Sequence, residues 1–587
     1  MEVFMKKLIA VLMVVFVVVG LMAGCGGSGD SGDEPTASQG GANEGALSKD
    51  DVVFVNNGES VYTIVRPETG ELEEGNRASN IFKKMKDTFG PSVKNEADTS
   101  DGTDKYEILV GNTNRPESKQ ALDHLKAKTG GRYDDFIVCT IGKKIVINAY
   151  CIDGLKAASD YFIKNYVKAE GIKGGIEYTY AAEGTWETYT INGVNISDFT
   201  IVRPHFNSSY LTQLEMEKIV DTVYTKTGYK LPIVDDKYVK EGTHEIVVGN
   251  TDRKDVKTVT GYETYDITVS GTKVYLNGGS AHATSMAVSE FAKLLYKGNV
   301  TDANSVANAD YNTALNGYDL AKTYRPVYYD NFDGDGIDTT KWRLMKGSEF
   351  RKDGQNGKLS GMTDDPNFVF VRDGKFWIYG HEDNDSYYGG TLVNNKTMRF
   401  HYGYVEHSVI CPDGDGFWSL LWFDNRGDAD NVLFGAEIDL NECFGNGTAT
   451  QANCHKWPTA YGASLGYEHQ SLDGAKYGTD KKYYHPDGGT WADGFHTFGF
   501  LWDATQMSFT ADGKVFFSYD ITQTPEDIDA FVDANLYMKL SYSVGRYNNN
   551  LLVENLTEYE WQNTNVLCCD WIYLYQFDDG VQFIEYK

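Results

Sequence analysis

Three carboxylates, Glu437, Asp439 and Glu442, lie within one six-residue segment that reads EIDLNE. Two glutamates can act as a nucleophile and as a general acid and base, and an aspartate between them can control the charge state of the nucleophile. These are the groups that cleave a glycosidic bond with retention of configuration. The chain has 84 Asp and Glu residues, so a solvated acidic surface is the alternative interpretation.

The alternation of acids with apolar residues in this segment predicts a β-strand. Glu437 and Asp439 would share one face of the strand, but Glu442 would point to the opposite face. A nucleophile and an acid on opposite faces of a sheet cannot act on the same sugar. One extra residue, a β-bulge at Leu440-Asn441, would return Glu442 to the face of its partners. The catalytic interpretation therefore requires this bulge.

Two neighbouring segments carry aromatic and polar side chains in phase. The run GFWSLLWF at 416–423 places Trp418 and Trp422 on one face, about 13 Å apart at ~3.3 Å per residue. Further along, Asn453, His455 and Trp457 alternate with other residues and would share a face. We predict that these five side chains bind a sugar substrate. The alternative is that the tryptophans and the histidine belong to the core.

The C-terminal part of the chain resembles glycoside hydrolase family 16 in several segments, which follow the family's order over residues 326–580. These segments are YDNF at 329–332 with Lys341-Trp342, FHYGYVE at 400–406, GFWSLLW at 416–422, EIDLNE at 437–442, FHTFGFLW at 495–502 with Asp512-Gly513, and DWIYLYQ at 570–576. The resemblance implies a concanavalin-like jelly-roll sandwich with a concave groove. It also implies Glu437 as the nucleophile, Glu442 as the acid/base and Asp439 as the assisting carboxylate.

The form of the acidic segment is similar to that of the laminarinase-like members of the family, which have the bulge. A β-glucan with β-1,3 linkages is therefore the expected substrate, with a mixed-linkage β-1,3-1,4-glucan or a galactan as alternatives. SLL at 419–421 and Cys443 depart from the laminarinase pattern, so the identity of the polysaccharide stays open. We expect no cofactor. Some family members bind a structural calcium ion, but the sequence singles out no ligands for it, and we assign no metal-binding residue.

Residues 1–25 have the pattern of a bacterial lipoprotein signal peptide. Two lysines at 6–7 precede an apolar run at 8–21, which is short for a membrane span, and LMAGC at 21–25 resembles a lipobox. Lipidation of Cys25 would anchor the protein at the extracellular face of the bacterial cell membrane. The alternative is an ordinary secretory signal. Residues 26–50 are rich in small and polar residues and read as a flexible tether.

The formal net charge of −30 opposes binding to nucleic acid or to an anionic membrane face. A polysaccharide substrate and the lipid anchor are therefore the expected partners, and the sequence predicts no oligomeric state. A non-catalytic polysaccharide-binding lipoprotein is the second hypothesis for the whole protein. Such a protein has no need of all three carboxylates.

The middle of the chain repeats itself. TIVRP at 63–67 recurs at 200–204, and EILVGNTNR at 107–115 recurs as EIVVGNTDR at 245–253, which indicates a duplication. Each copy reads as strand, helix, strand, a further strand and a final helix. We predict two tandem small α/β repeat domains at 51–190 and 191–320, followed by an all-β jelly-roll sandwich at 321–587. Nine of the ten tryptophans lie at 342–571, in the predicted sandwich.

Overall fold

The computed structural model describes most of the chain beyond residue 50. It covers residues 51–168, 171–309, 315–316, 323–347, 349, 351–383, 385–394, 398–425, 433–445, 448–471, 481–520, 530–532, 534–546, 552–577 and 583–585. The predicted signal peptide, with Cys25, and the predicted tether at 26–50 lie outside the described residues. No helix among the described residues is both long enough and apolar enough to cross a membrane.

By the density of its internal contacts, the chain divides into two compact units. The first contains the residues up to Thr190, together with Asn195–Asp198 and Val220–Pro232. The second contains Ile191–Val194, Phe199–Ile219 and Ile233–Lys587. Each unit is described by itself below.

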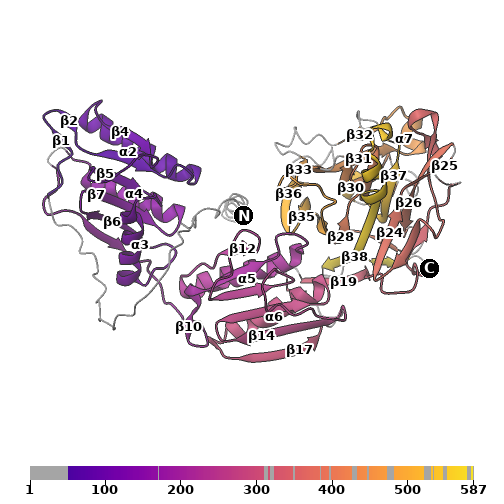
Figure 1. Ribbon diagram of the computed structural model, residues 1–587, viewed down its shortest axis with the longest axis horizontal. Helices are drawn as coiled ribbons and strands as arrows, with labels where there is room; N and C mark the ends of the chain where they lie inside the picture. The colour runs from indigo at the N-terminus through magenta and orange to yellow at the C-terminus, as the bar shows by residue number, and fades with distance from the viewer. Residues whose placement is uncertain are drawn as a thin grey trace, which may run out of the picture. The chain divides into compact units, whose positions relative to one another are not determined.

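The first repeat forms a six-stranded sheet with helices on both faces (Figure 1). The sheet order is β4 (Lys94–Ala97), β3 (Thr63–Arg66), β5 (Glu107–Val110), β7 (Lys144–Ala149), β6 (Phe136–Ile141) and β8 (Glu177–Tyr180), preceded by the hairpin of β1 (Val55–Asn56) and β2 (Glu59–Ser60). The first four strands of this order are parallel, and β6 and β8 join antiparallel. Helices α2 (Leu72–Phe89) and α4 (Ile152–Tyr166) pack on one face, and α3 (Pro116–Thr129) packs on the other.

The second repeat forms a sheet with the same strand order and directions. Its strands are β12 (Ile233–Asp235), β11 (Thr200–Arg203), β13 (Glu245–Val248), β15 (Lys273–Gly278), β14 (Thr264–Ser270) and β17 (Ala303–Asn308), and a small sheet combines β10 (Val194–Asn195), β9 (Thr190–Ile191) and β16 (Asn299–Val300). Its helices are α5 (Tyr210–Thr227) and α6 (Ala281–Leu295). The element order that we predicted for each repeat missed α3, the inner strands β6 and β14, and the edge strands β4, β8, β12 and β17.

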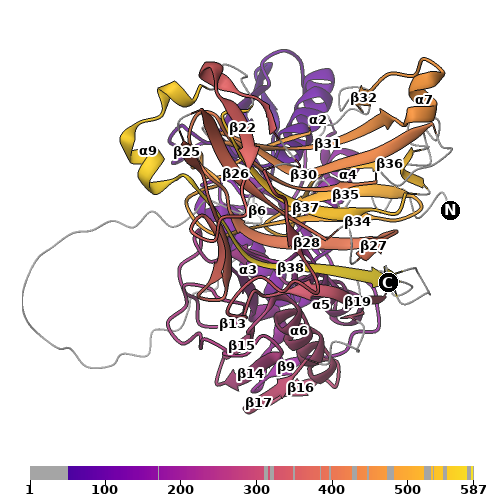
Figure 2. The same cartoon turned by 90° about the vertical axis from the view of Figure 1, so that its right-hand side faces the viewer.

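The C-terminal part is a jelly-roll sandwich of two large sheets, as predicted (Figures 1 and 2). One sheet runs in the order β18 (Leu315–Asn316), β19 (Thr323–Asp330), β38 (Val566–Phe577), β28 (Gly403–Ile410), β34 (His496–Trp502), β35 (Gln506–Ala511) and β36 (Lys514–Asp520), with β24 (Lys375–Tyr379) paired to β38 and β23 (Val369–Arg372) paired to β24. Figure 2 shows β28, β34 and β35 as neighbouring strands.

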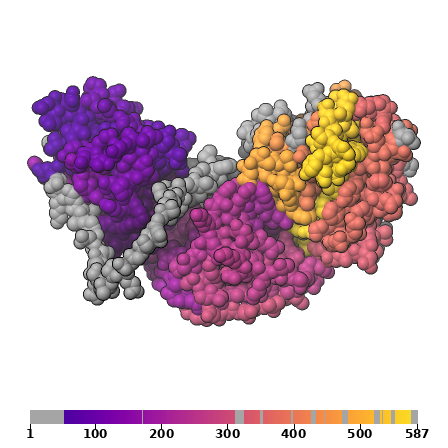
Figure 3. Space-filling view, in the orientation of Figure 1, coloured from indigo at the N-terminus to yellow at the C-terminus, as the bar shows by residue number. Residues whose placement is uncertain are grey.

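The second sheet of the sandwich carries the predicted acidic strand near one end. Its order is β21 (Arg351–Asp353), β22 (Leu359–Met362), β26 (Ser386–Val393), β37 (Tyr537–Val544), β29 (Phe417–Asp424), β30 (Phe434–Phe444), β31 (Ala449–Pro458) and β32 (Gln470–Ser471), with β20 (Arg343–Leu344) and β25 (His381–Asp383) paired to β26 and β33 (Lys482–Tyr484) paired to β31. The smaller elements are α7 (Ala460–Ser464), α9 (Glu558–Asn563) and the pair β27 (Met398–Phe400) and β39 (Phe583–Glu585). Figure 3 shows the surface of the C-terminal part in salmon, orange and yellow.

The core of the sandwich lies between its two sheets. In β29, Phe417, Leu421 and Phe423 are at most 1% exposed and face inward, whereas Trp418 and Trp422 point outward and are half-buried. Phe423 stacks on Phe500 of the opposite sheet with ring centroids 5.3 Å apart. Burial of such a side chain contributes about 1.5–3 kcal/mol. The alternation of the strand therefore presents its tryptophans on the outer face of the second sheet.

The seven described cysteines are all free thiols. Cys568 and Cys569 are fully buried in β38. Cys443 and Cys454 also point into the core but oppose Thr450 and Ile438, and not each other, across the β30–β31 pair.

Candidate active site

Strand β30 contains the β-bulge that is needed to bring Glu442 to the same face as Glu437 and Asp439. Asp439 lies opposite Asn453 on β31, and the next pair is Glu442 opposite Gln451, so three steps on β30 match two on β31. The extra residue returns Glu442 to the face of Glu437 and Asp439. The predicted bulge at 440–441 is therefore confirmed, and the three acids lie on one face of the sheet.

The side chain of Asn441 holds the bulge from inside the sandwich. Leu440 and Asn441 are both buried, at 0% and 1% exposure. Asn441 Oδ1 accepts hydrogen bonds from the backbone N–H of Leu421 (3.0 Å) and from Nε2 of His407 (3.2 Å), which belongs to the opposite sheet. Burial lowers the pKa of His407 to about 3, so its ring is neutral and donates this bond from one nitrogen. The amide oxygen of Asn441 thus takes the place of a backbone carbonyl of β30, which at the bulge no longer pairs with the N–H of Leu421 on β29.

The surroundings of Glu442 favour its protonated form. The residue is 5% exposed, and it accepts hydrogen bonds from Gln451 Nε2 (3.1 Å) and from Asn453 Nδ2. Burial first, and next the charge of Asp439, raise the pKa of the Glu442 carboxyl to about 8, against the lowering effect of the two amide donors. Glu442 therefore holds a proton at neutral pH, which a general acid must do.

Glu437 and Asp439 have different surroundings. Asp439 is 4% exposed, and its Oδ2 lies 3.3 Å from Nε2 of His455 on β31. Glu437 is half-buried and lies opposite His455 in the strand pairing. Ligand atoms of these three side chains lie within 4.8 Å of one another. The most accessible of the three acids is thus Glu437, beside a buried carboxylate and an imidazole.

A buried cation lies on the same face, next to Trp422. Lys539 of β37 forms an ion pair with Asp424 (2.6 Å), and its ammonium lies 4.1 Å from the ring centroid of Trp422. Trp422 Nε1 donates to Ser541 Oγ (2.8 Å), which fixes the plane of the indole. One side of the Trp422 ring is therefore occupied by Lys539, and a stacking sugar would have only the other side.

The other predicted sugar contacts also lie on the face of the acids. Trp418 stacks on Phe444 (5.6 Å, 19°), and Trp457 stacks on His469 (3.9 Å, 23°). His469 Nε2 also lies 3.0 Å from Nδ1 of His455. The structure thus brings together all eight side chains that the sequence singled out. Their role in substrate binding stays a prediction.

Some of the residues that hold the acids in place could be recognised in the sequence, and others could not. Gln451 is in phase with Asn453 and His455, so its place on the same polar strand face was visible in the sequence. Lys481, whose Nζ lies 2.5 Å from Asn453 Oδ1, and Lys539 had no such signal. They come from segments that meet the acidic strand only in the folded sheet.

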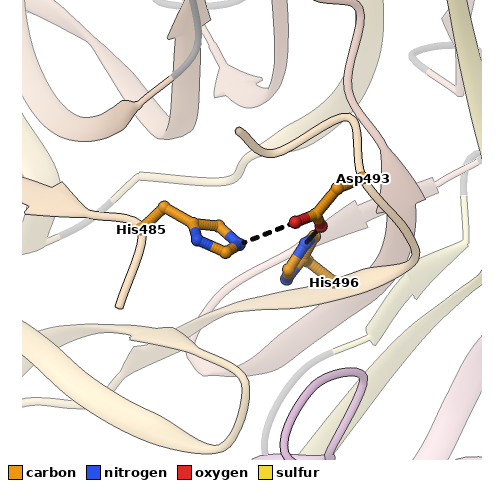
Figure 4. A group of neighbouring side chains, drawn as sticks. All are labelled: His485, Asp493 and His496. Carbon is orange, nitrogen blue, oxygen red and sulfur yellow. Dashed lines mark hydrogen bonds and ion pairs between the residues drawn. The ribbon is translucent and has the colours of Figure 1, made fainter. Parts of the chain in front are cut away.

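Two groups among the described residues have metal-ligand types, and the first is His485, Asp493 and His496 (Figure 4). The N–H of Gly489 donates to Nδ1 of His485 (3.1 Å), so Nε2 of this ring carries the proton and points to Asp493 (3.7 Å). His496 contacts Asp512 through Nδ1 (2.9 Å) and Asp493 through Nε2 (3.2 Å). Burial opposes the charged form of His496, but the two carboxylates raise its pKa. This group is an ion-pair network, because neither imidazole offers a free lone pair.

The second group is Glu437, Asp439 and His455, that is, two of the three acids and the histidine beside them. A cation held there would occupy the nucleophile that the proposed chemistry requires, so we assign no metal to it.

Comparison with known protein families identifies the class of the C-terminal domain. Residues 325–577 match the family model described as the GH16 domain of beta-porphyranases A–D. The C-terminal part of this chain is therefore a glycoside hydrolase family 16 domain, as its sequence motifs predicted.

Among curated proteins, glucan endo-1,3-beta-glucosidase A1 of Niallia circulans is 25% identical over 240 residues. The match covers 37% of this chain and 33% of that protein, so the chain spans about a third of the length of its relative.

Two solved structures are also similar to the C-terminal domain. The catalytic domain of an endo-1,3-beta-glucanase (laminarinase) from Thermotoga petrophila RKU-1 has 20% identity and a TM-score of 0.35, over 44% of this chain and 100% of that one. The endo-beta-1,3-glucanase of Pyrococcus furiosus has 18% identity and a TM-score of 0.34, over 45% and 97%.

Proposed function

We propose that this protein is a cell-surface, retaining endo-glycoside hydrolase that cleaves a β-glucan containing β-1,3 linkages. The single observation that carries the proposal is the bulge of β30, which turns Glu442 to the face of Glu437 and Asp439. The family of the C-terminal domain supports hydrolysis of a glycosidic bond. The curated relative, named as a glucan endo-1,3-beta-glucosidase, supports the choice of linkage.

The proposed reaction has two steps. The carboxylate of Glu437 attacks the anomeric carbon while Glu442 gives its proton to the leaving glycosidic oxygen, and a glycosyl ester on Glu437 forms. Glu442, now ionised, takes a proton from a water molecule, and this water attacks the anomeric carbon and releases Glu437. The two displacements together retain the configuration.

The sequence led us to expect that Asp439 controls the charge state of the nucleophile Glu437. In this proposal Asp439 acts instead on Glu442, because its charge helps to keep that carboxyl protonated. Its charge is one cause of the raised pKa of Glu442, so it keeps the acid protonated before the first step. His455, 3.3 Å from Asp439, holds that carboxylate in place.

Azide rescue tests the two roles separately. With an activated aryl β-glycoside, Glu437→Gly should lose hydrolysis and regain turnover with added azide, which gives a glycosyl azide of inverted configuration. Glu442→Ala should still form the glycosyl enzyme from this substrate, and azide should then give a product of retained configuration. The opposite pairing of products, or no rescue of either variant, would contradict the assignment.

Glu437→Gln separates catalysis from binding. This isosteric change should abolish hydrolysis while leaving the binding of the polysaccharide nearly unchanged, as measured by retention in gels that contain the polymer. Loss of binding together with activity would instead mean that Glu437 is structural. Full hydrolysis by the variant would contradict Glu437 as the nucleophile. Binding of the polysaccharide without hydrolysis by the unchanged chain would favour the alternative hypothesis of a binding protein.

A galactan is the second candidate substrate, because the matching family model describes beta-porphyranases. The net charge of −30 disfavours a strongly anionic polymer such as a sulfated galactan. The product profile on laminarin, mixed-linkage β-1,3-1,4-glucan, agarose and porphyran decides between these substrates. Release of oligosaccharides from laminarin is the expected result.

A further inference from the structure

The two repeats differ on one face of their sheets. In the first repeat, α3 covers a face whose centre is an apolar cluster. The cluster on this face comprises Val65, Leu109, Ile137, Cys139 and Val146 from the strands and Ala121 and Leu125 from α3. In the second repeat, α6 packs against β14 and β15 on one face, with α5 beside it through Thr212 and Ser285 (2.7 Å; Figure 1). The described residues provide no helix for the opposite face.

The chain is too short at this point to form the missing helix. Twenty residues, 116–135, connect Arg115 to Phe136 in the first repeat, but only eleven, 254–264, connect Arg253 to Tyr265 in the second. A matched pair of asparagines anchors the two connections. Asn148 donates to the carbonyl of Ser118 in α3 (3.2 Å), and Asn277 donates to the carbonyl of Lys257 in the short loop (2.9 Å). The loop therefore keeps the anchor of α3 and covers less of the sheet.

The side chains on the open face changed together with the helix. At the positions of Ile137 and Cys139 of β6, β14 carries Asp266 and Thr268, and Tyr275 takes the place of Val146. The intervening residues of β14, such as Ile267, remain apolar and face α6. Only the face without a helix has become polar.

A pocket of about 300 Å³ lies on this face. Its lining comprises Val247, Gly249, Asp255, Val256, Lys257, Asp266, Thr268, Ser270, Lys273, Tyr275, Leu276 and Asn277. Asp266 is 8% exposed and accepts a hydrogen bond from Thr268 Oγ1 (2.7 Å), and Tyr275 OH donates to Asp255 (3.4 Å). The pocket thus combines carboxylate, hydroxyl and amide groups with one aromatic side chain.

We propose that this pocket is a second carbohydrate-binding site, which holds one or two sugar residues of a neutral glycan chain. The volume is at the lower limit for a small-molecule site. Carboxylate and hydroxyl groups suit the hydrogen-bonding pattern of sugar hydroxyls, and the ring of Tyr275 offers an apolar wall for a pyranose. The identity of the glycan rests on the proposed function, because the site would then bind the polymer that the C-terminal domain cleaves.

The charges of the pocket favour a neutral ligand. Lys273 is paired with Glu245 (2.6 Å) and Glu241 (3.2 Å), so its charge is compensated within the sheet. Asp255 and Asp266 oppose an anionic ligand, and Lys257, which also lines the pocket, offsets part of their charge. A sugar chain without charged substituents avoids the penalty for an anion.

The first repeat shows which substitutions can test the proposed site, because β6 has apolar residues where β14 has the polar residues of the pocket. Asp266→Ile with Thr268→Cys installs the residues that β6 has at these positions, and Ser305→Ala, an exposed change on the other face of β17, is the control. Both are made in the full chain carrying Glu437→Gln, and retention is measured in gels that contain laminarin, mixed-linkage glucan or agarose. We expect the double variant to bind the retaining polymer at least threefold more weakly than the control.

The same changes in the active chain provide a second readout. Hydrolysis of a short soluble oligosaccharide should stay within twofold, which shows that the fold and the active site are intact. Equal retention of the double variant and the control on every polymer, or retention of the Glu437→Gln chain by none of them, would overturn the proposal. If the chain hydrolyses none of the glycans but the double variant still loses retention, the pocket proposal stands and the proposed function fails.

Discussion

Glu442 is a carboxylic acid buried beside a second carboxylate, and its proton determines when the proposed first step can occur. Because its pKa is about 8, kcat/KM should fall as the pH rises through about 8. Asp439→Asn removes a charge that raises this pKa, so the alkaline limb should move to lower pH, together with a loss of rate. The pH dependence of kcat/KM measures both effects. Asp493→Asn, in the ion-pair network, should leave the limb in place, and an unshifted limb in Asp439→Asn would contradict this account.

The same carboxyl makes stability depend on pH. Its pKa is about 8 in the folded protein and near the ordinary 4.5 in the unfolded chain, so the folded state binds the proton more tightly. This contribution is complete below about 4.5 and is lost as the pH rises through about 8. Glu442→Gln removes the titration, so its melting temperature relative to the parent should be higher at pH 8.5 than at pH 5. Tryptophan fluorescence reports this unfolding, since nine of the ten tryptophans lie at 342–571. A difference that is independent of pH would contradict the raised pKa.

Much of the site was predictable at this scale, because the types and spacing of side chains on one strand are visible in the sequence. Glu437, Asp439 and Glu442 lie on one face as expected, with Asn453 and His455 beside them. The cation over Trp422 was not predictable. Lys539 belongs to β37, which follows β29 by more than a hundred residues and pairs with it only in the sheet.

At the scale of the element, the bulge of β30 depends on one amide. Asn441→Ala would leave the backbone N–H of Leu421 and the ring of His407 without their buried acceptor, at a cost of about 1–3 kcal/mol. We expect this loss of unfolding free energy together with reduced kcat, because Glu442 lies next to Asn441. Denaturation followed by tryptophan fluorescence, and steady-state kinetics, measure the two effects.

Leu440→Met is the matched control for Asn441→Ala. It changes the neighbouring buried residue with little change in volume and should cost under about 1.5 kcal/mol. An Asn441→Ala protein as stable and as active as this control would mean that the backbone alone keeps the bulge.

The bulge of β30 could be predicted from the sequence, but the missing helix of the second repeat was not. The bulge was predictable because two acids of opposite parity require it. The absence of a counterpart to α3 in the second repeat was not deduced, although the shorter connection at 254–264 and the polar residues of β14 contained the signal. Apolar periodicity identifies a helix that exists, but it does not show which face of a sheet has no helix.

At the scale of the whole molecule, we propose that Cys25 carries a lipid. Cys25→Ala should release the protein from the membrane fraction into the medium, because it removes the thiol that the lipid modifies. Fractionation of cells followed by immunoblotting measures this change. Cys151→Ala, at a half-exposed cysteine of the first repeat, is the control and should stay with the membranes. Continued membrane association of Cys25→Ala would refute the lipobox interpretation.

We predicted domain boundaries at residues 190 and 320, and the compact units of the structure have other boundaries. The repeats were recognised by similar strings, whereas the units reflect contacts, and these join the sheet of the second repeat to the sandwich. Glu406 of β28 accepts hydrogen bonds from Ser209 Oγ (2.7 Å) and from the N–H of Tyr210 (2.8 Å) at the start of α5. Such a contact between distant segments leaves no trace in a repeat pattern.

The extra residue of β30 has a consequence for how this protein can vary. Because successive side chains alternate sides, deleting one residue between Asp439 and Glu442 would direct the second glutamate among the core phenylalanines. Inserting one residue would have the same effect. A library of variants with other amino acids at positions 440 and 441 can therefore contain active enzymes. A library with inserted or deleted residues at these positions cannot. Between Asp439 and Glu442, the number of residues therefore constrains the evolution of this protein more than their identity does.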